Sequence, residues 1–213
     1  MQFIRRGLCL VAFLIILILF LQSCWAHRNS SVPHDAACRP LLPLGITCEE
    51  RIDTVDRELT DLQPGDLLVT FSTHTLGWRH GHAALVIDSD TVLEAAMPGT
   101  VSALSSSDSW VTYASLLHLR VRDVSEQQQA AAADFAKSHL AGLPYGFFCG
   151  LGQHNAPAAP SSLQCAYLPW YAWHSQGMDL DSDGGRLVTV LDLAMSPQLE
   201  VIHSWGQSLP SKK

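Results

Sequence analysis

Basic residues are scarce in this sequence of 213 residues, and several common signatures are missing from it. There are 13 Lys and Arg against 20 Asp and Glu, which gives a net charge of −7. A protein that binds a nucleic-acid backbone needs the opposite sign, so we expect no nucleic-acid partner. No C-x-x-C pair occurs, so a structural zinc site has little support, and no internal repeat is present.

The apolar content of the chain is sufficient for one domain. The sequence is 47% hydrophobic, which at this length is enough for one ordinary core and too little for two. Strand patterns dominate the first part of the chain and helical patterns the second, an order that predicts an α+β fold. The predicted strands are 67–71, 83–87, 91–96, 116–121 and 187–191; the predicted helices are 49–59, 125–140 and 164–176; the predicted loops are 74–82, 98–110 and 143–163.

The N-terminus has the pattern of an export signal. Arg5 and Arg6 precede a fifteen-residue apolar run, residues 7–21, which is shorter than the ~20 residues that a membrane span needs. We therefore predict a signal peptide over 1–23, the alternative being a short span that is retained as an anchor. Removing Arg5 and Arg6 from the 13 Lys and Arg leaves 11 against 20 acidic residues, a net charge of −9. The mature protein is expected outside the cytoplasm.

Two processing sites compete after the apolar run. Leu21-Gln22-Ser23-Cys24 resembles a bacterial lipobox, in which Cys24 becomes the lipidated first residue. Cys24-Trp25-Ala26 has a small residue at each end, which suits ordinary signal peptidase before His27. We favour lipidation at Cys24, which predicts a membrane-anchored lipoprotein, and otherwise a periplasmic or extracytoplasmic protein. Residues 24–59 are then a lipidated tether or wrapping segment, 60–205 the folded domain and 206–213 a tail.

The remaining cysteines have separate expectations. Cys38 and Cys48 are ten residues apart in a Pro-rich segment, and in an oxidising compartment a disulfide between them would contribute ~2–3 kcal/mol. Cys149 and Cys165 are sixteen residues apart, and their pairing would abolish a nucleophile at Cys165. Cys9 lies in the signal.

Cys165 stands at the front of a predicted helix that ends before Gly177. Pro169 is tolerated only near the start of a helix, so the helix begins at about Gln164 or Cys165 at the earliest. A thiol at that end faces backbone N–H groups and the positive end of the helix dipole, and both stabilise a thiolate. Such a thiolate is a nucleophile if a histidine reaches it, and the alternative is a buried structural cysteine.

His82 and Glu94 are candidate partners for this thiol. His82 begins a predicted strand, and Glu94 interrupts the apolar run of the next strand, so a hairpin with its turn at 88–90 brings the two positions near each other. A carboxylate there would hold the tautomer of the imidazole. The alternatives are a satisfied core or edge histidine, a solvent-facing glutamate, and a metal site of three nearby histidines, for which no carboxylate at ligand spacing completes the set.

Five phrases of the sequence resemble, in their order, the circularly permuted papain-like cysteine hydrolases of the NlpC-related superfamily, the YiiX/YebB-like group. They span about residues 60–202 and are Leu62-Gln63-Pro64-Gly65-Asp66-Leu67, Gly81-His82-Ala83-Ala84-Leu85-Val86, Val92-Leu93-Glu94-Ala95, Leu143-Pro144-Tyr145 and Gly177-Met178-Asp179-Leu180-Asp181-Ser182-Asp183-Gly184-Gly185. The resemblance implies an α+β domain with an antiparallel sheet and the nucleophile at a helix N-terminus.

The resemblance also implies roles for individual residues. In that group the histidine precedes the cysteine, and the roles fall on His82 as base, Glu94 as third polar residue and Cys165 as nucleophile. Tyr145 and Gln164 are the implied substrate-binding residues, and neither a metal nor another cofactor is expected.

The chain departs from the group beside its cysteine. The group usually follows that cysteine with Ser-Glu-Leu, whereas here Ala166-Tyr167-Leu168 and then Pro169 follow. Gln164 stands where a tyrosine is common, and Gly146 stands where an acidic residue commonly follows the tyrosine of the Pro-Tyr phrase. These changes bear on the substrate and the rate more than on the fold.

The sequence therefore predicts an exported cysteine hydrolase, an amidase or peptidase that acts on a small peptide or amide of the cell envelope. Its contact with the membrane would be the N-terminal lipid. A lipid acyltransferase or thioesterase of the same fold is one alternative, which the aromatic residues Trp170, Tyr171 and Trp173 would suit. A non-catalytic binding domain is the other, which the changes after Cys165 permit.

Overall fold

The computed structural model describes residues 47–52, 57–75, 79–149 and 159–206, together with the single positions 15 and 151. Apart from position 15, the predicted signal peptide lies outside this part of the chain. So do the lipidation site Cys24, the residue Cys38 and the side chain of Cys48. None of the helices in the described ranges has the length and apolar character that crossing a membrane requires.

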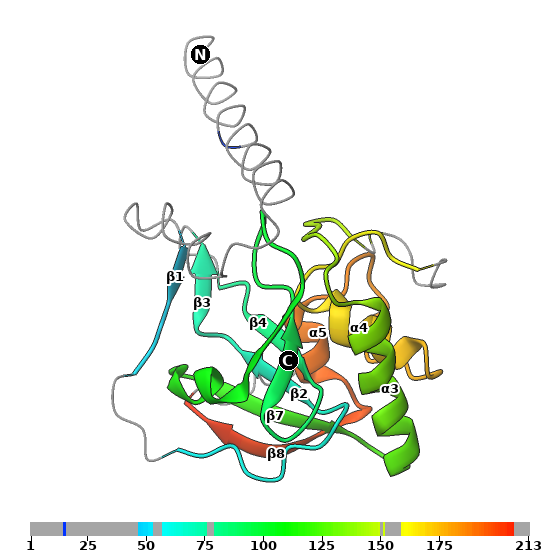
Figure 1. The fold of residues 1–213 in the computed structure, drawn as a ribbon. Helices are drawn as coiled ribbons and strands as arrows, with labels where there is room; N and C mark the ends of the chain where they lie inside the picture. The colour runs from blue at the N-terminus through cyan, green and yellow to red at the C-terminus, as the bar shows by residue number, and fades with distance from the viewer. Residues whose placement is uncertain are drawn as a thin grey trace.

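A six-stranded antiparallel sheet forms the centre of the fold (Figure 1). Its spatial order is β6-β5-β4-β2-β7-β8, and each neighbouring pair is antiparallel. The strands are β2 (Leu67–Thr70), β4 (His82–Val86), β5 (Thr91–Glu94), β6 (Ala103–Ser106), β7 (Leu116–Val121) and β8 (Leu199–Trp205). A separate two-stranded sheet pairs β1 (Thr47–Glu49) with β3 (Thr73–Thr75).

The two faces of the large sheet are covered by different helices. The helices are η2 (Ser107–Thr112), α3 (Glu126–His139), α4 (Tyr167–His174) and α5 (Val190–Met195). Because side chains alternate along a strand, Leu67 and Leu85 face the core that α3 and α4 cover, whereas Leu68 and Ala84 pack with Trp110 of η2 on the other face. Figure 1 shows α3, α4 and α5 gathered on one side of the sheet.

Several sequence predictions match this fold. The structure is α+β with an antiparallel central sheet, and strands β2, β4, β5 and β7 lie within or beside the predicted ranges. Helix α3 starts with a capping box, in which Ser125 accepts from the backbone N–H of Gln128 and the Gln128 side chain accepts from the backbone N–H of Ser125. After this helix the chain turns at Gly142, whose φ is 81°.

Other predictions of secondary structure were wrong, because tertiary pairing overrode weak local patterns. Glu49, the first residue of the predicted helix 49–59, belongs to strand β1. This strand pairs with β3, which overlaps the start of the predicted loop 74–82. The predicted loop 98–110 contains β6 and most of η2. The serines at 105–107 are typical of loops, so neither element was predicted. The predicted strand 187–191 is the start of α5, since Thr189 and Asp192 form a capping box. Strand β8 was not predicted.

Helix α4 is buried around its whole circumference. Leu168, Tyr171 and Ala172, which share one face at helical spacing, are buried, and so are Trp170 and Trp173, which lie elsewhere around the helix. A helix that is apolar all round belongs inside a core. The aromatic side chains of α4 therefore pack the interior, where Trp173 Nε1 donates to the Gly65 carbonyl at 2.8 Å, and they give no support to a greasy binding site.

Candidate functional site

His82 is the first residue of β4, and strand pairing fixes the position of its backbone. Its backbone position pairs with Thr70 of β2, and its side chain is buried. The preceding Gly81 has a φ of 74°, and a Cβ there would lie 2.8 Å from both the Thr70 carbonyl oxygen and Val190 Cγ1. Only glycine fits this approach to β2 and α5, so Gly81 fixes where β4 starts and hence where the His82 ring lies.

Glu94 at the end of β5 lies beside His82. The register of the hairpin pairs Ala84 with Glu94, so His82 is two residues further along β4 and projects from the same face. His82 Nε2 and Glu94 Oε2 are 2.7 Å apart, a short hydrogen bond between two largely buried side chains. The second carboxylate oxygen, Oε1, accepts from Ser105 Oγ at 2.5 Å.

Trp110 covers the His82 ring from the η2 side. The two rings are stacked, with centroids 5.2 Å apart and an angle of 15° between their planes. Trp110 is almost fully buried and also makes an edge contact with Tyr113. This stack keeps water from one face of the imidazole. Sequence reasoning missed Trp110 and Ser105, because both lie in the stretch predicted as a loop.

Cys165 lies in the turn that leads into α4, two residues before its first helical residue. The backbone N–H of Leu168 already donates to the Gln164 carbonyl at 3.1 Å, a helical bond that encloses Cys165 in the first turn. The sulfur is largely buried, and its S–H donates to Gln164 Oε1 at 3.6 Å. Cys165 also interacts with the side chain of His82, whose pKa it helps to raise. Since Nε2 of that ring is engaged by Glu94, Nδ1 is the nitrogen available to the sulfur.

The surroundings of His82 favour its protonated form. Burial by itself lowers the pKa of the imidazole. The hydrogen-bonding and charge interactions with Cys165 and Glu94 outweigh this effect and raise the pKa to about 10. At neutral pH the ring is therefore an imidazolium flanked by a sulfur and a carboxylate.

Tyr145 and Gln164 lie next to the thiol in different ways. Tyr145 is half-buried on the segment paired with Leu163, and burial together with the nearby Cys165 and Cys149 raises the pKa of its phenol. Gln164 is buried, its Nε2 donates to the Val188 carbonyl at 2.6 Å, and its Oε1 accepts from the Ala166 N–H at 3.0 Å. The Gln164 side chain thus braces the turn that carries Cys165.

The segment around Gly146 explains one departure from the YiiX-like pattern. The Gly146 N–H donates to the Leu163 carbonyl at 2.8 Å, which brings the segment against the chain before Cys165. A Cβ at Gly146 would collide with the Ser162 side chain, so the acidic residue common at this position does not fit here. Cys149 is a free thiol in this segment, and burial, with the nearby Cys165, raises its pKa to about 12.

A second buried charge cluster, centred on Asp66, lies on β2 and β7 of the sheet. Asp66 accepts from Arg120 Nε and Nη2 at 2.8 and 2.7 Å and from the Gln63 N–H at 2.9 Å, and its Oδ2 is 2.7 Å from His118 Nε2. Burial raises the pKa of Asp66, but these hydrogen bonds outweigh it and hold the pKa below its usual value. The cluster ties the turn before β2 to β7 and contains none of the residues around Cys165.

A group of side chains with metal-ligand geometry is found in the acidic turn and α5. Within the described ranges, one set of at least three His, Cys, Asp or Glu meets the distance requirement, and it consists of Asp181, Asp183 and Asp192, with ligand atoms within 4.8 Å of one another. Asp192 Oδ2 is already engaged as the cap of α5. His74, His80 and His82 are not part of that set, and His80 Nδ1 contacts the Gly81 carbonyl.

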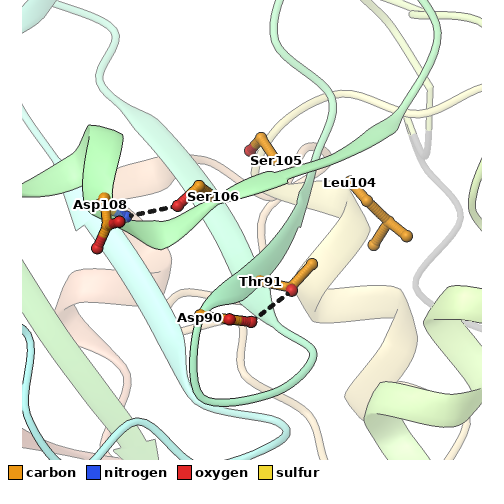
Figure 2. A pocket seen from close by; sticks show the side chains of 6 residues that line it. All are labelled: Asp90, Thr91, Leu104, Ser105, Ser106 and Asp108. Carbon is orange, nitrogen blue, oxygen red and sulfur yellow. Dashed lines mark hydrogen bonds between the residues drawn. The ribbon is translucent and has the colours of Figure 1, made fainter.

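A shallow hollow of about 330 Å³ lies at the outer edge of β5 and β6 (Figure 2). It is lined by Asp90, Thr91, Leu104, Ser105, Ser106 and Asp108. Among these lining residues, Ser105 contacts the site around His82, because its hydroxyl donates to Glu94. The hollow therefore borders Ser105, the outer member of the row of hydrogen bonds that starts at His82.

The chain was compared with known families, curated proteins and solved structures. No known protein family and no curated protein matches it. Its structure is similar to the crystal structure of "metalloprotein yiiX from Escherichia coli O157:H7, DUF1105", with a TM-score of 0.50 and 16% sequence identity over 67% of this chain and 98% of that chain. At this identity the likeness concerns the fold alone, which is YiiX-like.

Proposed function

We propose that the protein is an exported cysteine hydrolase with a circularly permuted papain-like fold, which acts on an amide or peptide of the cell envelope. The observation that carries the proposal is that the His82 ring is hydrogen-bonded to Glu94 and lies close enough to Cys165 for the thiol to raise the pKa of the ring. A nucleophile, a base and an orienter for that base are the three parts that such a hydrolase needs. The fold is YiiX-like, and the order of the two residues, histidine before cysteine, is the order that the sequence resemblance to the permuted group implies.

The proposed reaction starts from a thiolate and an imidazolium. The thiolate attacks the carbonyl carbon of the amide, and the backbone N–H of Cys165 is a candidate donor to the oxyanion that forms. His82 gives its proton to the leaving amine as the thioester forms. His82 then takes a proton from water, which hydrolyses the thioester and restores the initial pair.

Each surrounding residue has a part in this proposal. Glu94 holds the ring so that Nδ1 faces the sulfur, and its charge stabilises the imidazolium. Trp110 shields the ring from water, which strengthens both hydrogen bonds. Gln164 holds the turn around Cys165, and Tyr145, half-buried beside the thiol, is the better candidate for contact with substrate.

A thioesterase or acyltransferase acting on lipid is the second candidate, and exposed apolar side chains favour it. Phe147, Phe148 and Leu151 are 49%, 68% and 53% exposed. They flank Cys149, whose sulfur accepts from the backbone N–H of Gln164, directly before the nucleophile. Large apolar side chains at such a place would suit an acyl chain.

The similar structure is that of a metalloprotein, so a metal site is considered for this chain as well. Asp181, Asp183 and Asp192 are the described residues that fit a cation, and an all-carboxylate set suits a hard ion such as Ca²⁺ or Mg²⁺. The proposed reaction takes no step through this set, because its nucleophile and proton carrier are protein side chains.

Product analysis tests the proposal directly. The wild-type protein and Cys165→Ala are incubated with peptidoglycan-derived peptides, and in parallel with acyl esters and thioesters. Release of a new amine by the wild type alone supports the amidase or peptidase. Release of fatty acid alone supports the second candidate. No turnover, combined with a Cys165 thiol that is alkylated only near pH ~8.5, would identify a binding domain instead.

The expected export has its own test, because nothing in the described residues bears on it. Intact-mass analysis of membrane fractions compares two mature forms, one with a lipidated Cys24 and one that starts at His27. We expect the lipidated form, since the lipobox-like residues directly follow the apolar run. An unmodified chain that starts at His27 would contradict it.

A further inference from the structure

Ser105 completes a row of hydrogen bonds that runs across three neighbouring strands. His82 on β4 bonds to one oxygen of Glu94 on β5 at 2.7 Å, and Ser105 on β6 donates to the other oxygen at 2.5 Å. The carboxylate is therefore held at both oxygens, once by a ring N–H and once by a hydroxyl.

The register of the sheet explains why Ser105 is the residue that reaches Glu94. Glu94 pairs directly with Ala103, and Ser105 is two residues further along β6. It therefore projects from the same face of the sheet as Glu94, two residues out of register as His82 is, but displaced toward the opposite end of β5. Each contact in the row is thus fixed by backbone pairing, and no loop is involved.

A carboxylate held at one oxygen alone can rotate about its last side-chain torsion, which is broad and weakly restrained. A second donor removes this freedom and also stabilises the ionised form, because a hydrogen bond to a charged form favours that form. Glu94 is largely buried, with 13% of its side chain exposed, so few water molecules are available to replace the donor. Ser105 thus supplies what solvent would supply to an exposed carboxylate.

We propose that Ser105 is a positioning residue of the candidate active site, which acts on His82 through Glu94. The inference rests on the proposed function, since it assigns Ser105 a part in keeping the His82 imidazolium charged and correctly turned. Ser105 itself makes no contact with the reacting atoms in this account.

The adjacent Ser106 gives a matched control. Figure 2 shows Ser106 bonded to Asp108 and Thr91 bonded to Asp90, contacts that lie around the same hollow. The Ser106 hydroxyl accepts from the Asp108 N–H at 3.2 Å as the cap of η2, whereas Ser105 donates to Glu94. Both serines are on β6, but Ser106 bonds to the start of η2 and Ser105 bonds to the carboxylate of Glu94. A loss of activity through general damage to β6 would appear in both variants.

The test measures how fast iodoacetamide alkylates Cys165, from pH 5 to 11, in wild type, Ser105→Ala and Ser106→Ala. Peptide mapping counts only the Cys165 product, and the melting temperature of each variant is recorded. The alkylation rate of Cys165 should change at the alkaline pH at which the His82 imidazolium loses its proton. We expect this change to occur about one pH unit lower in Ser105→Ala, because Glu94 loses a donor to its charged form and then stabilises the imidazolium less. Ser106→Ala should keep the wild-type profile.

A second pair of variants separates the hydroxyl from the space it fills. Ser105→Thr keeps the hydroxyl and Ser105→Val has nearly the same shape without it, and β-branched residues are well tolerated in strands. We expect Ser105→Thr to restore the wild-type profile and Ser105→Val to reproduce that of Ser105→Ala. This pair also decides the question if Ser105→Ala does not fold.

The outcomes distinguish a failure of this inference from a failure of the proposed function. If wild-type Cys165 reacts only as an ordinary thiol with a pKa of ~8.5, the proposed function fails and the inference fails with it. If wild type reacts rapidly at low pH but Ser105→Ala and Ser105→Val have the same profile as wild type, only the role of Ser105 is overturned. A shift in Ser106→Ala equal to that in Ser105→Ala would also overturn it.

Discussion

His82 and Glu94 lie two residues out of register on neighbouring strands, and this offset brings His82 Nε2 to 2.7 Å from Glu94 Oε2. Directly opposite positions would place the two Cβ atoms too close for the long glutamate side chain to meet the ring end-on. The bond to Glu94 occupies Nε2, so Nδ1 is the ring nitrogen left for the interaction with Cys165, which helps to raise the pKa of the ring. One histidine thus connects the sheet to the turn that begins α4.

Replacement of the thiol is the first test of the proposed chemistry. We expect Cys165→Ser to lose more than about 10³-fold in turnover, because a serine hydroxyl next to His82 does not ionise as a thiol does. The melting temperature should stay near that of wild type, since the side chains have similar size. Cys149→Ser is the control, as its thiol is not hydrogen-bonded to His82, and it should retain activity. Turnover in Cys165→Ser comparable to wild type would refute the mechanism.

The roles of His82 and Glu94 predict a ranking of variants. His82→Ala removes the proton carrier and should cost ~10²–10⁴-fold in turnover. Glu94→Gln keeps the shape and still accepts a hydrogen bond, so it should lose the least, and Glu94→Ala should fall between the two. Rate measurements on the three purified variants establish the order. Wild-type rates in Glu94→Ala would mean that another residue orients the ring.

The same variants predict a change in pH dependence. The pKa of His82 is raised to about 10, so the imidazolium of the wild type persists through neutral pH and is lost as the pH rises toward 10. Loss of the Glu94 charge lowers that pKa, so both Glu94 variants should lose activity at a lower pH on the alkaline side. Profiles of turnover against pH measure the shift. An alkaline limb that stays in place in both variants would contradict the assignment.

Asp66 should matter for stability and not for chemistry. Its pKa is held below the usual value, so it stabilises the folded state above pH ~3.8, and this stabilisation is lost as the pH falls through the lowered pKa. Asp66→Asn leaves Arg120 without its counter-charge and should cost ~3–5 kcal/mol in the free energy of unfolding. Urea unfolding at pH 7 and pH 3 measures both effects, with the exposed Asp123→Asn as control. Equal stability of Asp66→Asn and wild type would contradict it.

Gly81 is predicted to fix the position of His82. In Gly81→Ala the new Cβ would lie 2.8 Å from the Thr70 carbonyl and from Val190, in a backbone conformation that L-residues rarely adopt. We expect a loss of about 1–3 kcal/mol in stability together with a loss of activity. Gly142→Ala is the matched control, because its φ is also positive, at 81°, but nothing lies within 4 Å of the new Cβ. It should lose some stability and keep its activity, which melting curves and turnover would show.

The sequence alone was sufficient wherever local chemistry decides the structure. Apolar runs with a turn at residues 88–90 determined the β4–β5 hairpin, and a two-residue alternation then dictates that His82 and Glu94 share a face. The capping box at Ser125 determined where α3 begins. The proline at 169 limited how far before it α4 can extend, and the chain enters its first turn at Gln164, within that limit.

Only the tertiary structure decided which distant residues complete the site. Ser105 and Trp110 lie in a stretch without apolar alternation, and β6 forms there because β5 offers it a backbone partner. Likewise, Thr47–Glu49 is a strand because β3 lies beside it, although the sequence pattern predicted a helix that starts at Glu49. The contact of Cys165 with His82 joins residues 83 positions apart, which no local pattern specifies. Such contacts arise when the packing of a whole core places one element on another. The free energy of burying that core is shared among residues scattered along the chain, so no short segment specifies the contact.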